Sequence, residues 1–104
     1  MANVPNPRDF ERAANSRIEA MIEELVEKAS DEAFAEFGGS LIRFNHRWHS
    51  IEPWTAVIEA RITNAYFDTS DEGGRHLMFE VVVRNPHNGH DETITRSYHS
   101  VEFV

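Results

Sequence analysis

Two histidines and a carboxylate lie within five residues in the segment His87-Asn88-Gly89-His90-Asp91. The segment is rich in turn formers, so its side chains need not alternate between two faces. Imidazole and carboxylate groups suit zinc, nickel or iron. One hypothesis is therefore a metal or small-ligand site formed by His87, His90 and Asp91, with an enzymatic role as its extension. The other interpretation is that all three are ordinary polar loop residues.

A second pair of histidines occurs in RFNHRWHS, residues 43–50. Phe44, His46 and Trp48 alternate with polar residues, which is the pattern of a strand. Residues three apart on a strand point to opposite faces, so His46 and His49 cannot bind one ion there. The alternation also predicts that Trp48 belongs to the core. Trp54 follows a proline in a turn, and we expect it to be a partner-binding anchor.

Other chemistry has little support in the sequence. There is no cysteine, which removes thiolate nucleophiles, thiolate metal ligands and disulfides. No serine has the context of a nucleophile elbow, and no glycine-rich phosphate-binding motif is present. The sequence therefore favours a non-enzymatic protein without a cofactor.

Charge gives the strongest functional indication. The formal net charge is −8, which opposes direct binding to nucleic acid and to anionic membranes. Residues 8–37 contain nine acidic and four basic residues. We expect a partner-binding face there that includes Glu23, Glu24, Glu27 and Asp31. Such a face is suited to a protein partner with a basic surface, and charge would speed the encounter. A virus-type inhibitor or adaptor that mimics nucleic acid is the leading hypothesis, and a merely solvated surface is the alternative.

The first third of the chain has the pattern of a helix. Asn6 and Pro7 form a start signal, and Gly38-Gly39 forms a stop signal. Between them, apolar residues recur at steps of three and four without a change of phase. We therefore expect one long helix over residues 7–37, after a flexible segment at residues 1–5.

Four strands follow, beginning near residues 42, 55, 75 and 92, with turn-rich segments at 68–74 and 85–91. For the second hairpin, the expected register places Ile62 beside Val81 and Glu59 beside Arg84. Across the last hairpin, a register that joins opposite charges and apolar neighbours pairs Arg84 with Glu92, Val82 with Ile94, Glu80 with Arg96 and Met78 with Tyr98.

These elements predict an α+β fold in which one helix covers a four-stranded antiparallel meander spanning residues 41–104, all in one domain over residues 1–104. The sheet face opposite the helix would then carry an apolar stripe of Phe67, Met78, Val82, Ile94 and Tyr98. Because a single helix leaves that face uncovered, we expect the stripe to form a homodimer interface. In the meander, the turn before Trp54 and the turn at His87 lie at the same end of the sheet.

The N-terminus lacks the features of a signal peptide, and no apolar stretch approaches the ~20 residues that cross a bilayer. A cytoplasmic location, in a cell or in a host cell, is the expectation. The sequence thus predicts a small acidic binding protein, with the histidine-lined site as the alternative.

Overall fold

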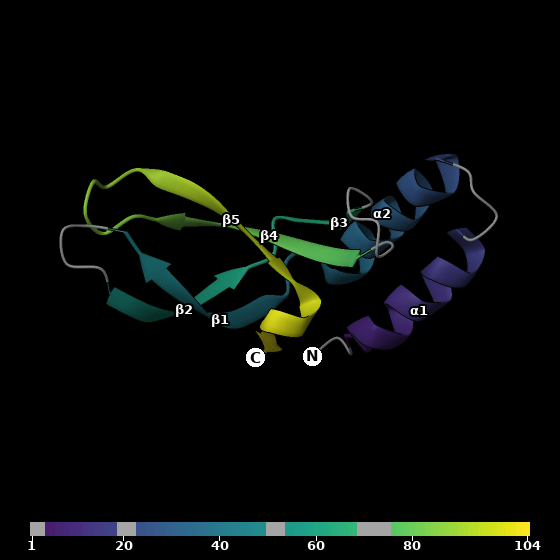
Figure 1. Ribbon diagram of the computed structural model, residues 1–104, viewed down its shortest axis with the longest axis horizontal. Helices are drawn as coiled ribbons and strands as arrows, with labels where there is room; N and C mark the ends of the chain where they lie inside the picture. The colour runs from purple at the N-terminus through teal and green to yellow at the C-terminus, as the bar shows by residue number, and fades with distance from the viewer. Residues whose placement is uncertain (1–3, 19–22, 50–53, 69–75) are drawn as a thin grey trace.

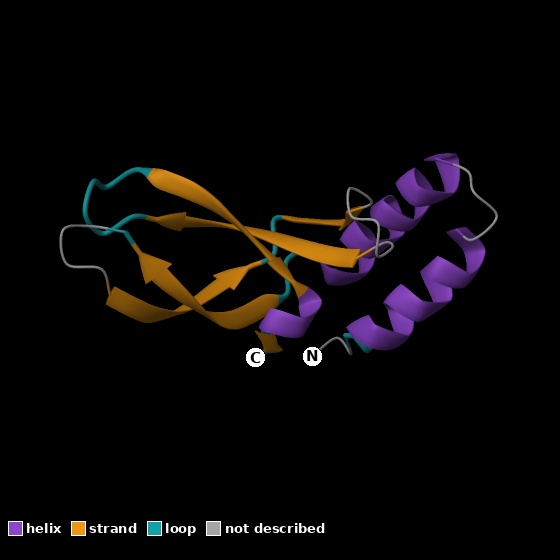
Figure 2. Ribbon diagram, viewed as in Figure 1, coloured by secondary structure: helices purple, strands orange, loops and turns teal. Residues whose placement is uncertain are grey.

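The computed structural model describes residues 4–18, 23–49, 54–68 and 76–104. The molecule is elongated, with principal extents of 47 × 36 × 19 Å. Two helices lie side by side at one end, and the strands extend from them to the other end, where the turn between β4 (His76–Arg84) and β5 (Asp91–Ser97) lies (Figure 1; Figure 2). The expected α+β class is confirmed.

The single helix expected over residues 7–37 is wrong, because the chain forms α1 (Pro7–Ile18) and α2 (Glu23–Phe37) instead. In a continuous helix, Phe10 and Phe37 would be about 40 Å apart. In the structure their ring centroids are 5.2 Å apart, edge to face. This arrangement brings Phe10 of α1 against both Phe37 of α2 and Phe67 of the strand region, so both helices add apolar side chains to one core.

The helix ends follow the sequence signals. Asn6 caps α1, since its side-chain oxygen accepts a hydrogen bond from the Arg8 backbone N–H at 2.9 Å. After α2, the Gly38 N–H donates to the Phe34 carbonyl at 2.9 Å, and Gly39 has a φ of +82°, which glycine adopts without strain.

The four-stranded meander is also wrong, because the strands form two three-stranded sheets. The first has the order β2-β1-β6, from β1 (Leu41–Trp48), β2 (Trp54–Arg61) and β6 (Glu102–Phe103). The second has the order β3-β4-β5, from β3 (Asn64–Asp68), β4 (His76–Arg84) and β5 (Asp91–Ser97). A 3-10 helix, η1 (Tyr98–Ser100), links β5 to β6.

The strand expected near residues 55–67 divides because its backbone changes partners at one peptide bond. The Ile62 N–H donates to the Ser40 carbonyl at 2.9 Å, which extends the pairing of β2 with the β1 side. The next N–H, of Thr63, donates to the Glu80 carbonyl at 2.8 Å in the other sheet. The chain therefore turns a corner between Ile62 and Thr63, and β2 and β3 belong to different sheets.

Both expected registers are wrong: each hairpin is shifted by one residue, and Glu59, expected beside Arg84, lies in the other sheet opposite Arg43. Val81 lies opposite Ile94 and Arg84 lies opposite Asp91, while β3 pairs with β4 through Ala65 opposite Phe79. The turn between β4 and β5 sets the register of this last hairpin, since the Asn85 N–H donates to the His90 carbonyl and Gly89 adopts a φ of +73°.

Burial explains why the register with more ion pairs does not form. The observed pairing places Ile94 on the core face, where it is 6% exposed. Burying such a side chain is worth about 1.5–3 kcal/mol, whereas an exposed ion pair is worth about 0–1 kcal/mol. A slip by one residue would turn Ile94 to solvent.

The core lies between the helices and the two sheets. Its most buried large side chains are Phe37, Ile42, Leu77, Phe79 and Val81. Polar side chains of the helices also bind strand backbone: Ser30 Oγ accepts from the Phe67 N–H at 3.0 Å, and Glu11 Oε2 accepts from the Leu77 N–H at 2.8 Å. The helical end therefore holds the second sheet in a fixed position.

Candidate functional site

The predicted acidic face corresponds to the exposed side of α2. Glu27 and Asp31 are exposed one turn apart on this helix. Glu23 and Glu24 begin the helix, but their side chains fall outside what the structure describes. Lys28 is exposed beside Glu27, so the face carries one positive charge among its carboxylates.

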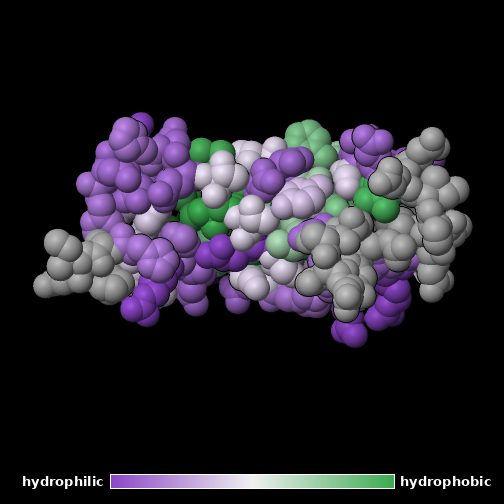
Figure 3. Space-filling view, turned by 45° about the horizontal axis from the view of Figure 1, so that its top comes forward, coloured by the Kyte–Doolittle hydropathy of each residue, from purple (hydrophilic) through white to green (hydrophobic). Residues whose placement is uncertain are grey.

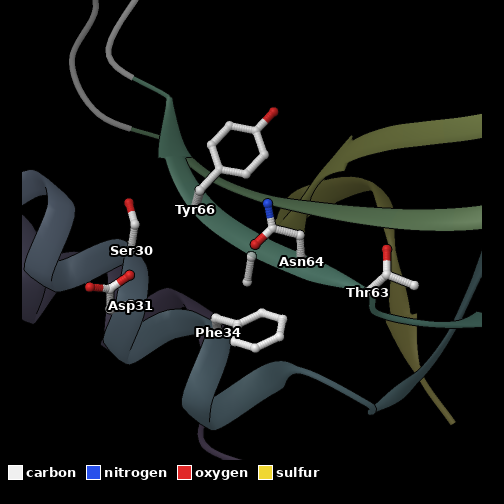
Figure 4. A pocket seen from close by; sticks show the side chains of 7 residues that line it. Ser30, Asp31, Phe34, Thr63, Asn64 and Tyr66 are labelled. Atoms are coloured by element: carbon white, nitrogen blue, oxygen red, sulfur yellow. The ribbon is translucent and has the colours of Figure 1, made fainter.

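A pocket lies next to this face, between α2 and β3 (Figure 4), with a volume of about 520 Å³. We call it the α2–β3 pocket. The helix supplies one wall and the strand supplies the other. Its lining residues are Ser30, Asp31, Phe34, Thr63, Asn64, Ala65 and Tyr66.

Phe34 is the apolar surface of the pocket and is 48% exposed. Residues 31 and 34 are three apart on a helix, so the Asp31 carboxylate and the Phe34 ring lie on the same side of α2. The Phe34 ring leans toward the end of the helix, where a Cβ added to Gly38 would be in ordinary contact with the ring at 3.4 Å. The same Cβ would lie 2.6 Å from the Phe34 backbone carbonyl oxygen, which is too close, so the helix end requires glycine there.

Several polar groups around the pocket already have partners. Ser30 Oγ holds the Phe67 N–H, and Thr63 Oγ1 donates to the Glu80 carbonyl at 3.1 Å. In contrast, the Asp31 carboxylate has no ion-pair or hydrogen-bond partner within the described part of the chain. The pocket therefore offers one carboxylate that is available to a ligand.

Tyr66, on the strand wall of the pocket, has a raised pKa. Burial raises the pKa of Tyr66, and the carboxylates of Glu80 and Asp68 raise it further, against a lowering by the hydrogen bond with the Thr95 side chain. The Tyr66 hydroxyl is hydrogen-bonded to the Thr95 side chain on β5 and is directed away from α2 (Figure 4), so this shift belongs to the outer face of the second sheet.

Sequence reasoning missed both Phe34 and the strand wall. Ala33 is on the buried stripe of the helix, so the next residue, Phe34, lies off that stripe. Its position therefore indicated an exposed aromatic residue. The β3 wall had no such signal, because the corner at Ile62 depends on tertiary hydrogen bonds.

The predicted apolar stripe does not exist as one surface. Val82 is 47% exposed and Met78 is partly exposed, but Ile94 and Phe67 are buried in the core. Tyr98 lies in η1, where burial and the hydrogen-bonded Glu11 carboxylate raise its pKa. Homodimerisation stays a prediction, and the patch left to support it on this face is Met78 and Val82.

At the other end of the molecule, Trp54 at the start of β2 lies against His87 of the last turn, while residues 50–53, the expected turn before it, lie outside the described residues. Trp54 Nε1 donates a hydrogen bond to His87 Nε2 at 3.0 Å, and the rings are edge to face. Trp54 remains 43% exposed, while Trp48 is 3% exposed, as its place in the strand pattern predicts. Figure 3 shows one face of the molecule on which the turn end is largely hydrophilic and hydrophobic residues gather toward the middle.

Two of the three candidate metal ligands in the last turn have side-chain partners within the protein: His87 Nε2 accepts from Trp54 Nε1, and Asp91 lies 3.7 Å from Arg84 Nε. The backbone N–H of His90 donates to Asn88 Oδ1 at 2.9 Å. Among the residues that the structure describes, no group of three or more histidine or carboxylate side chains is arranged to hold a metal ion.

His46 forms a second contact between the sheets. Arg96 Nη2 on β5 donates to His46 Nδ1 on β1 at 2.9 Å, and the guanidinium carbon of Arg96 lies 5.2 Å from the centre of the Phe44 ring. Because arginine only donates, Nδ1 must be unprotonated. Burial lowers the pKa of His46, and the Arg96 charge lowers it further.

No helix in the described part of the chain is long and apolar enough to cross a membrane. Comparisons with protein-family models, with curated proteins and with solved structures gave no match, so the function is inferred from the chain's own residues.

Proposed function

We propose that this protein is a small, non-enzymatic binding module that docks on a basic protein surface through α2. The observation that carries the proposal is a strip of exposed side chains along α2: the carboxylates of Glu27 and Asp31, followed by the half-exposed ring of Phe34. Carboxylates beside an exposed aromatic residue combine electrostatic attraction with a surface that can be desolvated on contact.

The net charge of −8 supports the same proposal. It attracts a basic partner over a distance of about one Debye length, which raises the association rate and makes it sensitive to salt. In its most specific form, the module is an inhibitor or adaptor that occupies a basic groove in place of nucleic acid.

The test uses a fluorescent nine-residue lysine peptide as the basic probe and measures its binding at low salt. We expect the double variant Glu27→Lys, Asp31→Lys to bind the peptide at least tenfold more weakly, chiefly through slower association. Its folding should be nearly unchanged, because both side chains are exposed.

The matched control is the double variant Asp91→Lys, Glu92→Lys at the turn end. It changes the net charge by the same amount, and both of its residues are exposed. Binding close to that of the natural protein locates the interaction on α2. An equal loss in both variants would show that only net charge matters and would contradict the proposal.

A further inference from the structure

The α2–β3 pocket has the features of a site for one cationic side chain. Its volume of about 520 Å³ is within the ~300–1,000 Å³ typical of ligand sites. Among its described lining residues there is no lysine, arginine or histidine, and the charged one is Asp31.

The geometry of the helix wall favours a planar cation. Asp31 and Phe34 are three residues apart, so one group can contact the carboxylate and the ring together. A guanidinium forms paired hydrogen bonds to a carboxylate and stacks on an aromatic face, whereas an ammonium is a compact and strongly hydrated charge. Figure 4 shows Asn64 on the facing strand, whose amide is a further possible hydrogen-bond partner.

We propose that the α2–β3 pocket binds an arginine side chain of the basic partner, with Asp31 pairing with the guanidinium and Phe34 stacking against it. This inference rests on the proposed function and makes it specific. The lysine-rich remainder of the partner contacts Glu27 and the rest of the acidic face.

The test compares three peptides: nine lysines, the same peptide with a central arginine, and the same peptide with a central citrulline. Citrulline has nearly the shape of arginine but no charge. We expect the arginine peptide to bind roughly three- to fivefold more tightly than the lysine peptide, the size of one exposed cation–π contact. The citrulline peptide should be the weakest.

Three variants distinguish binding in the pocket from general electrostatic attraction. Phe34→Leu keeps the charge and loses the ring, and Asp31→Asn keeps the shape and loses the charge. Both should remove the preference for arginine. Glu27→Gln is the matched control, because it removes one carboxylate from the same helix outside the pocket lining. It should weaken all three peptides and retain the preference.

Location is tested by the backbone amide signals of residues 63–66 in nuclear magnetic resonance. We expect these signals to shift with the arginine peptide more than with the lysine peptide. Equal binding of arginine and lysine peptides would overturn the pocket inference and leave the proposed function standing. Failure of all three peptides to bind at low salt would overturn both.

Discussion

The two ends of this molecule are held together by different forces. At the helical end, α1, α2 and the sheets meet through aromatic rings, with Phe37 in contact with Phe10, Phe79 and Phe103 at centroid distances of 5.2–5.9 Å. At the turn end, Trp54 donates a hydrogen bond to His87, and between the two sheets His46 accepts one from Arg96. The ring contacts of the helical end involve no titratable group, whereas a proton on His46 Nδ1 would remove the acceptor that Arg96 uses.

The difference also separates stability from binding. The helical end is fixed by buried apolar contacts, so the exposed side of α2 is free to carry an unpaired carboxylate and a half-exposed ring. The turn end uses polar side chains for internal contacts, since His87 and Asp91 have partners within the chain. This contrast supports the proposal that α2 is the binding surface.

The largest expected effect is at the helical end. Phe37 is fully buried, and replacing it with alanine should lower the free energy of unfolding by about 3–5 kcal/mol through lost contacts and a cavity. Urea denaturation measures this change. Phe34→Ala on the same helix is the matched control and should cost less than about 1 kcal/mol, because Phe34 is exposed. Similar losses in both variants would contradict the placement of the two rings.

A pH-dependent effect is expected at the contact between His46 on β1 and Arg96 on β5. The folded protein holds His46 with a lowered pKa, so the unfolded chain binds a proton more readily. The stabilisation by His46 is complete above its unfolded pKa of about 6.5. It is lost as the pH falls from there through the lowered folded value. Among the charged or titratable neighbours, Arg96 and His49 also lower the pKa of His46, and Glu92 raises it.

Urea midpoints measured between about pH 7.5 and 5.5 check this expectation, in a range above most carboxylate titrations. The control is His46→Asn, whose amide oxygen can accept from Arg96 as Nδ1 does and which does not titrate. The natural protein should lose stability across the range more steeply than this variant. Identical slopes would show that the His46 contact does not respond to protons.

The smallest expected effect concerns the hydrogen bond from Trp54 to His87. Trp54→Phe removes the indole N–H and should lower the free energy of unfolding by about 0.5–1.5 kcal/mol, toward the lower limit because Trp54 is exposed. His87→Gln should cost less, since its amide oxygen can accept at the position of Nε2. A larger loss in the glutamine variant would argue against the hydrogen bond as the source of the effect.

The local part of the fold was predictable from the sequence. Asn6 and Gly39 mark helix ends, and alternation predicts which face of β1 is buried, because these features depend on a few neighbouring residues. The registers and the corner at Ile62 depend on distant backbone partners such as Ser40 and Glu80. A choice of register based on charge pairs was wrong because burial of Ile94 outweighs them.

The candidate site was predictable on one side only. Glu27 and Asp31 are recognisable as an exposed acidic strip from helix periodicity, and Phe34 lies off the buried stripe. The opposite wall, Asn64 to Tyr66, comes from a strand whose position follows from the corner. Periodicity therefore predicts the acidic face, and only the tertiary structure shows that a pocket adjoins it.

The pairing of β6 with β1 has a consequence for the order in which the chain folds. The other strand pairs join segments that are neighbours in the sequence, whereas this pair joins Ile42 to Phe103. Closing so long a loop has a larger entropic cost than closing a hairpin, and the β1–β6 pairing that offsets it has two residue pairs. We therefore expect the hairpins to form early and β6 to join late. The carboxyl-terminal residues, which bring Phe103 against Phe37 and Phe79, complete the core last and leave it first.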